Sequence, residues 1–197
     1  RASLEETDIP NRHCLDLIDA FKQDAVKNRY DDWPDLMEYC SRSASPVGRY
    51  LIDLHGGSDN GYGPSDALCN ALQVINHLQD CKDDFLTLNR VYLPGDWMGE
   101  EGMGVVELAG EQSSPQVRQV LNRTLSATED LMGEARSLPV GVRCWRLAME
   151  SAAILNIAER LIARLRIEDP LATRVALTKP GYAWQCIRGV IPVALGV

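Results

Sequence analysis

The sequence predicts an all-α fold, a bundle of helices around a central cavity. Over long stretches of the 197-residue chain, apolar residues recur at intervals of three and four, the spacing that places them on one face of a helix. No segment alternates convincingly between apolar and polar residues, as a half-buried β-strand would. Glycine and proline gather between the periodic stretches, where they mark helix ends and loops.

The first expected helix spans Leu15–Tyr30, which has apolar residues in a helical rhythm. A second helix is expected to start at Asp32 and Pro34, because a proline in the first turn loses no hydrogen bond. It is expected to continue to about Ser43.

Pro46 is expected to kink this helix or to restart it, with the helical stretch then continuing to His55. A loop follows, rich in residues that break helices: Gly56, Gly57, Gly61, Gly63 and Pro64. We expect Ser65 or Asp66 to cap the next helix.

The second half of the chain is also predicted to be helical. Residues 100–110 form a short connector that could cover the mouth of a cavity. Long helices are expected over 114–136 and from 138 to just before Pro170. The apolar tail, 183–197, is expected to pack as a terminal helix or strand-like end, with contact to a membrane surface as the alternative; no run reaches the ~20 apolar residues of a membrane span.

One predicted helix, from Leu72 toward Pro94, carries an oxygen-rich stripe. At ~100° per residue, its polar side chains fall within roughly 60° of one line. They are Gln73, Asn76, Asp80, Asp83, Asp84 and Thr87. The opposite side is apolar, with Leu68, Ala71, Val74, Ile75, Leu78, Cys81 and Phe85.

An acidic stripe is most often a solvated helix face. Here, however, Asp80 and Asp84 stand four residues apart and repel each other, and the stripe carries no Lys or Arg. A bound cation would relieve this repulsion, and the amide oxygens of Asn76 and Gln73 also suit a hard cation. Because Mg²⁺ usually keeps waters and substrate phosphates as ligands, the stripe fits half of a metal and diphosphate site.

These residues resemble the squalene and phytoene synthases. The second aspartate-rich motif of that family is followed by an Arg-x-Tyr-Leu-Pro segment, matched here by the stripe and by Arg90, Tyr92, Leu93 and Pro94. The segment Glu38–Gly48, with the sequence EYCSRSASPVG, is similar to the family's Tyr-Cys motif. A weaker match, DPLATRVALTK, places Arg174 where the family has an arginine that contacts diphosphate. The spelling of the first two blocks is most similar to the bacterial hopanoid-pathway branch.

The chain also departs from the family. Gln79 replaces an arginine that often precedes the motif's first aspartate, so diphosphate binding is expected to use other cations. The family's first aspartate-rich motif has no counterpart, since Asp16 and Asp19 have the wrong spacing. We therefore expect this chain to be the larger, C-terminal part of a longer enzyme whose N-terminal helices are missing.

The resemblance implies a role for each matched residue. Metal ligands would be Asn76, Asp80 and Asp84 with Gln73, while Asp83 would act through water or orient basic partners. Arg90 and Arg174 would bind the diphosphate, the alternative being ordinary ion-pair arginines. Tyr39 would face the cavity and stabilise cationic intermediates or position the diphosphate; the alternative is a buried core tyrosine.

The reaction that the resemblance implies is Mg²⁺-dependent conversion of presqualene diphosphate to hydroxysqualene. One alternative is head-to-head condensation of two farnesyl diphosphates to presqualene diphosphate, or on to squalene with NADPH, although no nucleotide motif favours the reductive step. Another is a non-catalytic helical scaffold or assembly factor, which the intact aspartate stripe argues against.

Composition favours one soluble domain, with 45% hydrophobic and 24% charged residues. A net charge of −8 argues against broad binding to nucleic acid or anionic lipid. The six cysteines show no metal-ligand spacing and are interpreted as buried apolar residues in a reducing compartment. This interpretation predicts a cytoplasmic protein. Peripheral contact with the inner face of the membrane is the alternative location. His77 is expected to be a hydrogen-bonded structural histidine. The oligomeric state is not encoded in any pattern of the sequence.

Overall fold

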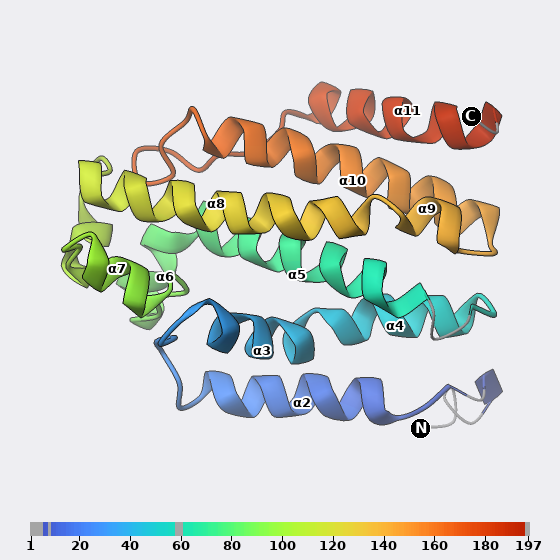
Figure 1. The fold of residues 1–197 in the computed structure, drawn as a ribbon, viewed down its shortest axis with the longest axis horizontal. Coiled ribbons are helices and arrows are strands. Elements are labelled where there is room, and N and C mark those ends of the chain that lie inside the picture. The colour runs from blue at the N-terminus through green and yellow to red at the C-terminus, as the bar shows by residue number, and fades with distance from the viewer. Residues whose placement is uncertain (1–5, 8, 58–60, 196–197) are drawn as a thin grey trace.

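The computed structural model describes residues 6–7, 9–57 and 61–195, and within these ranges it contains helices and no strand. The all-α prediction is therefore confirmed. Figure 1 shows the main helices side by side in a stack, with α2 at one edge and α11 at the other. The stack is built by α2 (Arg12–Asp24), α5 (Tyr62–Gln79), α8 (Pro115–Ala135), α10 (Trp145–Leu165) and α11 (Lys179–Leu195).

The first helix is shorter than predicted. It ends at Asp24, and the following residues pass to α3 (Trp33–Ser43) without helical structure. Tyr30, expected to be helical, lies in this connection and is buried. The start of α3 is as predicted, because the Asp32 carboxylate accepts a hydrogen bond from the backbone N–H of Asp35 at 2.8 Å.

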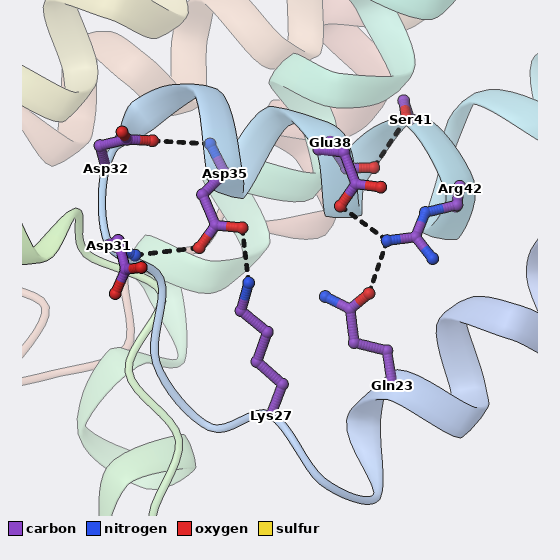
Figure 2. A network of polar contacts seen from close by, with 8 residues as sticks. All are labelled: Gln23, Lys27, Asp31, Asp32, Asp35, Glu38, Ser41 and Arg42. Atoms are coloured by element: carbon purple, nitrogen blue, oxygen red, sulfur yellow. Dashed lines mark hydrogen bonds and ion pairs between the residues drawn. The ribbon is translucent and has the colours of Figure 1, made fainter.

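Polar contacts fasten α3 to α2 and to the connection between them (Figure 2). Asp35 accepts from Lys27 Nζ at 2.5 Å and from the backbone N–H of Asp31 at 3.0 Å. Arg42, at the other end of α3, donates to Gln23 of α2 at 2.6 Å. These contacts fix α3, and with it Tyr39, relative to α2.

The restart at Pro46 is confirmed, since α4 covers Ser45–Leu54 directly after α3. The expected cap of α5 is wrong. The helix begins at Tyr62, so Gly63 and Pro64 lie inside its first turn, and Asp66 instead forms an ion pair with Arg49 of α4 at 2.5 Å. The expected glycine loop lies partly outside the described residues.

Short helical elements lie between the long helices after α5. They are α6 (Cys81–Leu88), α7 (Gly95–Glu100), the 3₁₀ helix η2 (Val105–Ala109) and α9 (Leu138–Gly141). The prediction for α8 is confirmed, with the Ser114 hydroxyl accepting from the N–H of Val117 at 3.1 Å. The single helix expected after residue 138 is broken into α9 and α10 by residues 142–144.

The cysteine interpretation is only partly right. All six thiols are free, and Cys40 and Cys81 are buried as expected. Cys14 is exposed, and the other three are half-buried. None of the described helices is long and apolar enough to cross a membrane.

The apolar tail is a packed helix through Leu195, as predicted. Its close approach to α10 depends on Gly189, which is buried. A Cβ atom at this position would overlap the backbone carbonyl of Ala152 on α10. Because backbone atoms cannot rotate away, only glycine fits between the two helices as they are packed.

Gly189→Ala is expected to lower the free energy of unfolding by about 1–3 kcal/mol, because the helices must separate to accept the methyl group. Chemical unfolding measures the loss, and hydrogen exchange should show it concentrated in α11. Gly133→Ala is the matched control: it lies on α8 with open space around its Cβ position, so it should be neutral or stabilise by up to about 1 kcal/mol. Equal stability of the two variants would contradict this account of the helix contact.

Candidate functional site

The predicted stripe helix is broken at its first aspartate. α5 ends at Gln79 and α6 begins at Cys81, so Asp80 stands alone between them with φ −107° and ψ 7°. Its N–H still donates to the carbonyl of Asn76 at 3.0 Å, and its carbonyl accepts from the N–H of Asp84 at 2.8 Å. The apolar side of the predicted helix is buried or half-buried as expected.

Although the stripe itself carries no Lys or Arg, Arg174 from a distant segment contacts it. Its guanidinium reaches Asp80 with Nε at 2.9 Å from one carboxylate oxygen and Nη2 at 3.2 Å from the other. Ninety-four residues separate the two along the chain, so the pairing is tertiary. Two of the predicted site residues thus come together.

The other stripe residues differ in exposure. Asn76 and Asp83 are exposed, whereas Gln73 and Asp84 are half-buried. Burial raises the pKa of Asp84 above its usual value, and the negative charges of Asp80 and Asp83 raise it further, while Arg90 opposes them. Asp84 therefore lies within electrostatic range of the other carboxylates and of a predicted diphosphate ligand.

The segment that carries Arg174 is held by two residues beside Asp80. The amide of Gln79, which is buried, donates to the carbonyl of Val175. Lys82 Nζ donates to the carbonyls of Gly110 at 2.8 Å and Leu171 at 3.0 Å. Gln79 thus anchors the backbone next to Arg174.

A polar groove of about 210 Å³ lies at this junction. It is lined by Gln79, Lys82, Asp83, Pro170, Leu171, Ala172, Thr173 and Arg174. A basic and an acidic side chain of the predicted site, Arg174 and Asp83, therefore border the same groove.

Tyr39 lies in a buried aromatic cluster, with only 3% of its surface exposed. Its ring centroid is 5.3 Å from that of Tyr30, 6.0 Å from Tyr92 and 6.2 Å from His77. Burial raises the pKa of the Tyr39 hydroxyl, so it remains protonated at neutral pH.

Arg90 connects this cluster with the carboxylates. Its Nη2 donates to the carbonyl of Asp24 at 2.6 Å. Burial raises the pKa of Tyr92, and hydrogen bonding to Arg90 and Tyr39 partly offsets that increase. Since Arg90 also acts on Asp84, the cluster and the acidic residues form one electrostatic unit.

His77 is a packed structural residue, but the expectation that it is hydrogen-bonded is not met at Nε2, which is buried without a partner. Its ring stacks on Tyr92 with the centroids 3.4 Å apart and the planes 8° from parallel. Burial, with the charge of Arg90, lowers its pKa to about 3, so the ring is neutral at pH 7. The sequence pattern did not select Tyr92 as a site residue, although it stands in the Arg-Val-Tyr-Leu-Pro segment.

An apolar cavity of about 170 Å³ lies between α4, α5 and α10. From α5 it is lined by Leu68, Cys69 and Leu72. Leu72 precedes Asp80 by eight residues, which is about 12 Å along a helix. One helix therefore connects an apolar cavity to the acidic junction.

The carboxylate and amide oxygens at the junction between α5 and α6 fit part of a Mg²⁺ site. Among the described residues, no group of three or more His, Cys, Asp or Glu side chains could hold a metal ion by itself. Mg²⁺ needs fewer protein ligands, because it is commonly bound by one or two carboxylates together with waters and phosphates. The raised pKa of Asp84 beside Asp80 marks the repulsion that a cation would relieve. Asp80 and Asp84, with the amide of Asn76, suit one side of such a site.

Comparison with known proteins gives consistent matches. The family model described as squalene/phytoene synthase matches residues 1–180. Hydroxysqualene synthase of Rhodopseudomonas palustris is 44% identical over 90% of this chain and 61% of its own length, and that of Sinorhizobium fredii is 42% identical with the same coverage. The chain thus spans about three fifths of these relatives.

Solved structures agree with the sequence matches. Squalene synthase HpnC from Alicyclobacillus acidocaldarius superposes with a TM-score of 0.77 at 33% identity, covering 83% of this chain and 62% of that one. A dehydrosqualene synthase in complex with ligand superposes with a TM-score of 0.85 over 96% of this chain and 67% of that one. At 18% identity, the second match shows the fold alone.

Asp84→Asn is expected to raise the melting temperature of the metal-free protein at pH 7. The folded protein holds the proton of Asp84 more tightly than the unfolded chain, so its ionised form costs stability above the folded-state pKa. The asparagine removes that cost, and its advantage should shrink as the pH falls toward about 4. Melting curves across this range test it; an Asp84→Asn variant that is less stable at pH 7 would show that the carboxylate stabilises the fold.

Proposed function

Because this chain belongs to the squalene/phytoene synthase family, we propose that its protein converts presqualene diphosphate to hydroxysqualene, with Mg²⁺ and with release of diphosphate. The observation that carries the proposal is the placement of Asp80 and Asp84 beside Arg174 and Arg90, at the end of the helix that lines an apolar cavity. The relatives named hydroxysqualene synthase support hydroxysqualene as the product.

Ionisation of a prenyl diphosphate requires that the charge of the leaving diphosphate be neutralised. Arg174 and Arg90 are the basic side chains at the junction that would bind its oxygens. When bound, Mg²⁺ would supply Lewis-acid stabilisation of the same leaving group, held by Asp80, Asp84 and Asn76. Gln73, one turn before Asn76 on α5, would orient the substrate through its amide.

Substrate binding would require Arg174 to leave Asp80 for the diphosphate, and breaking their ion pair costs little free energy. The arginine side chain is 63% exposed, and pairs this exposed contribute about 0–1 kcal/mol. Substrate can therefore attract Arg174 to phosphate oxygens and free the Asp80 carboxylate for a cation. Gln79 and Lys82 keep the backbone of the arginine's segment in place during this change.

The aromatic cluster would border the carbocation that forms during the reaction. The rings of Tyr39, Tyr92 and His77 are uncharged at neutral pH, since their pKa values are shifted toward the neutral forms. Aromatic faces attract a carbocation without forming a bond to it. The prenyl chains would lie along apolar helix surfaces such as those of the cavity between α4, α5 and α10.

Product analysis by mass spectrometry tests the proposal. The complete protein, given Mg²⁺ and presqualene diphosphate without NADPH, should form hydroxysqualene, and Asp80→Ala should abolish turnover while keeping the helical circular-dichroism spectrum. Asp19→Ala, which removes an exposed carboxylate on α2, is the control and should stay active. Presqualene diphosphate formed from farnesyl diphosphate would favour the condensing reaction, and no product from either substrate would favour a non-catalytic scaffold.

Tyr39→Phe is expected to lower turnover by about tenfold or more, while it lowers stability by only about 1 kcal/mol. The hydroxyl lies among Tyr92, Arg90 and Asp24, where it can order the groups that face the substrate. Tyr30→Phe removes an equally buried hydroxyl from the same cluster and should leave turnover nearly unchanged. If Tyr39→Phe instead loses stability and keeps its kcat, Tyr39 is a core residue.

A further inference from the structure

The outward face of α11 is a continuous apolar stripe. Four large side chains fall within about 80° of arc on this helix. Their exposed fractions are 58% for Trp184, 50% for Ile187, 49% for Ile191 and 72% for Leu195. A stripe of this length and regularity marks a contact surface more often than scattered apolar residues do.

The opposite face of α11 is fixed to the bundle. Gln185 and Gly189 are buried, and Gly189 packs directly on the backbone of α10 at Ala152. The stripe therefore belongs to a docked helix at the edge of the stack (Figure 1), and it cannot turn inward without breaking the glycine contact.

The charge of α11 is opposite to that of the whole chain. The helix contains Lys179 and Arg188 and no acidic residue, in a protein of net charge −8. Arg188 and Trp184 border a groove of about 360 Å³, which Arg160 of α10 lines from the other side. Within the described part of the chain, no ion pair or hydrogen bond is formed by either arginine, whereas Glu159 in the same groove is paired with Arg136 at 2.9 Å.

We propose that this face docks on an anionic lipid bilayer, with α11 lying in the plane of the interface. Trp184 and the three aliphatic side chains would enter the boundary between headgroups and acyl chains, and the groove arginines would bind lipid phosphates. Tryptophan favours this boundary because its ring is apolar with one polar N–H. The helix would lie on the membrane, in keeping with the finding that no described helix can span one.

The arrangement of charge favours lipid over a second copy of the chain. A two-fold dimer across this face would bring the unpaired arginines of both copies together, with no acidic partner on α11 to receive them. An anionic bilayer supplies both an apolar layer and the opposite charge. The docking does not depend on which reaction the protein catalyses.

Vesicle sedimentation of the complete protein tests this docking. Binding to phosphatidylcholine vesicles containing phosphatidylglycerol should be about tenfold tighter than binding to phosphatidylcholine alone. Ile187→Glu should abolish binding, and Arg160→Gln with Arg188→Gln should remove the preference for phosphatidylglycerol. The matched control is Ile167→Glu, an isoleucine that is 87% exposed outside α11 and should have no effect.

Circular dichroism and melting curves confirm that each variant is folded. Equal affinity for the two vesicle types, or full binding by Ile187→Glu, would overturn the proposal. Failure of the complete protein to bind either vesicle type would do so too. A dimer in light scattering that Ile187→Glu dissociates would identify the face as an interface between copies instead.

Discussion

The arrangement of the site depends on the burial of α5. Its residues Val74, Ile75, His77, Leu78 and Gln79 are all buried, so both flanks of its last turns are packed against neighbouring elements. Within residues 73–80, only Gln73, Asn76 and Asp80 retain access to solvent. The polar atoms of the helix are thus concentrated on one narrow strip, with the apolar cavity about two turns before its end.

The two acidic residues at the junction differ in their partners. Asp80 and Asp84 remain one turn apart, since the N–H of Asp84 donates to the carbonyl of Asp80 at 2.8 Å, and the Asp80 carboxylate pairs with Arg174. Asp84 remains half-buried with its pKa raised by burial and by its neighbours. A carboxylate whose ionised form is unfavourable in the folded protein is typical of functional sites, because a bound cation supplies the compensating positive charge.

The starts of α3 and α8 could be predicted because they carry side-chain signals. Asp32 and Ser114 each cap a helix with the hydrogen bond that their residue type suggests. Helix ends and breaks lacked such signals: no glycine or proline marks the break at Asp80 or the end of α2 at Asp24. Asp66 is a residue type that often caps helices, but in the structure it lies inside α5 and forms an ion pair with Arg49.

The site residues likewise divide into those that a local sequence pattern predicted and those whose contacts depend on tertiary packing. The stripe was visible because its members share one helix face, and Tyr39 and Arg90 were selected through the family resemblance. The contact of Arg174 with Asp80 joins distant parts of the chain, so local periodicity could not predict it. The stacking of His77 on Tyr92 likewise depends on tertiary packing, and its effect on the histidine pKa follows from burial that the spacing does not reveal.

Local charge would let an acidic chain bind the proposed anionic substrate and the proposed anionic surface. The net charge of −8 repels both at long range, but screening limits that repulsion to about 8 Å in physiological salt. Within this distance the decisive groups are Arg90 and Arg174 at the carboxylates, and Arg160 and Arg188 beside α11. Arg160 and Arg188 lie beside the apolar stripe of α11, and the helix that ends next to Asp80 lines an apolar cavity about 12 Å away. A molecule with a phosphate head and a hydrocarbon chain is therefore favoured over a free anion at both places.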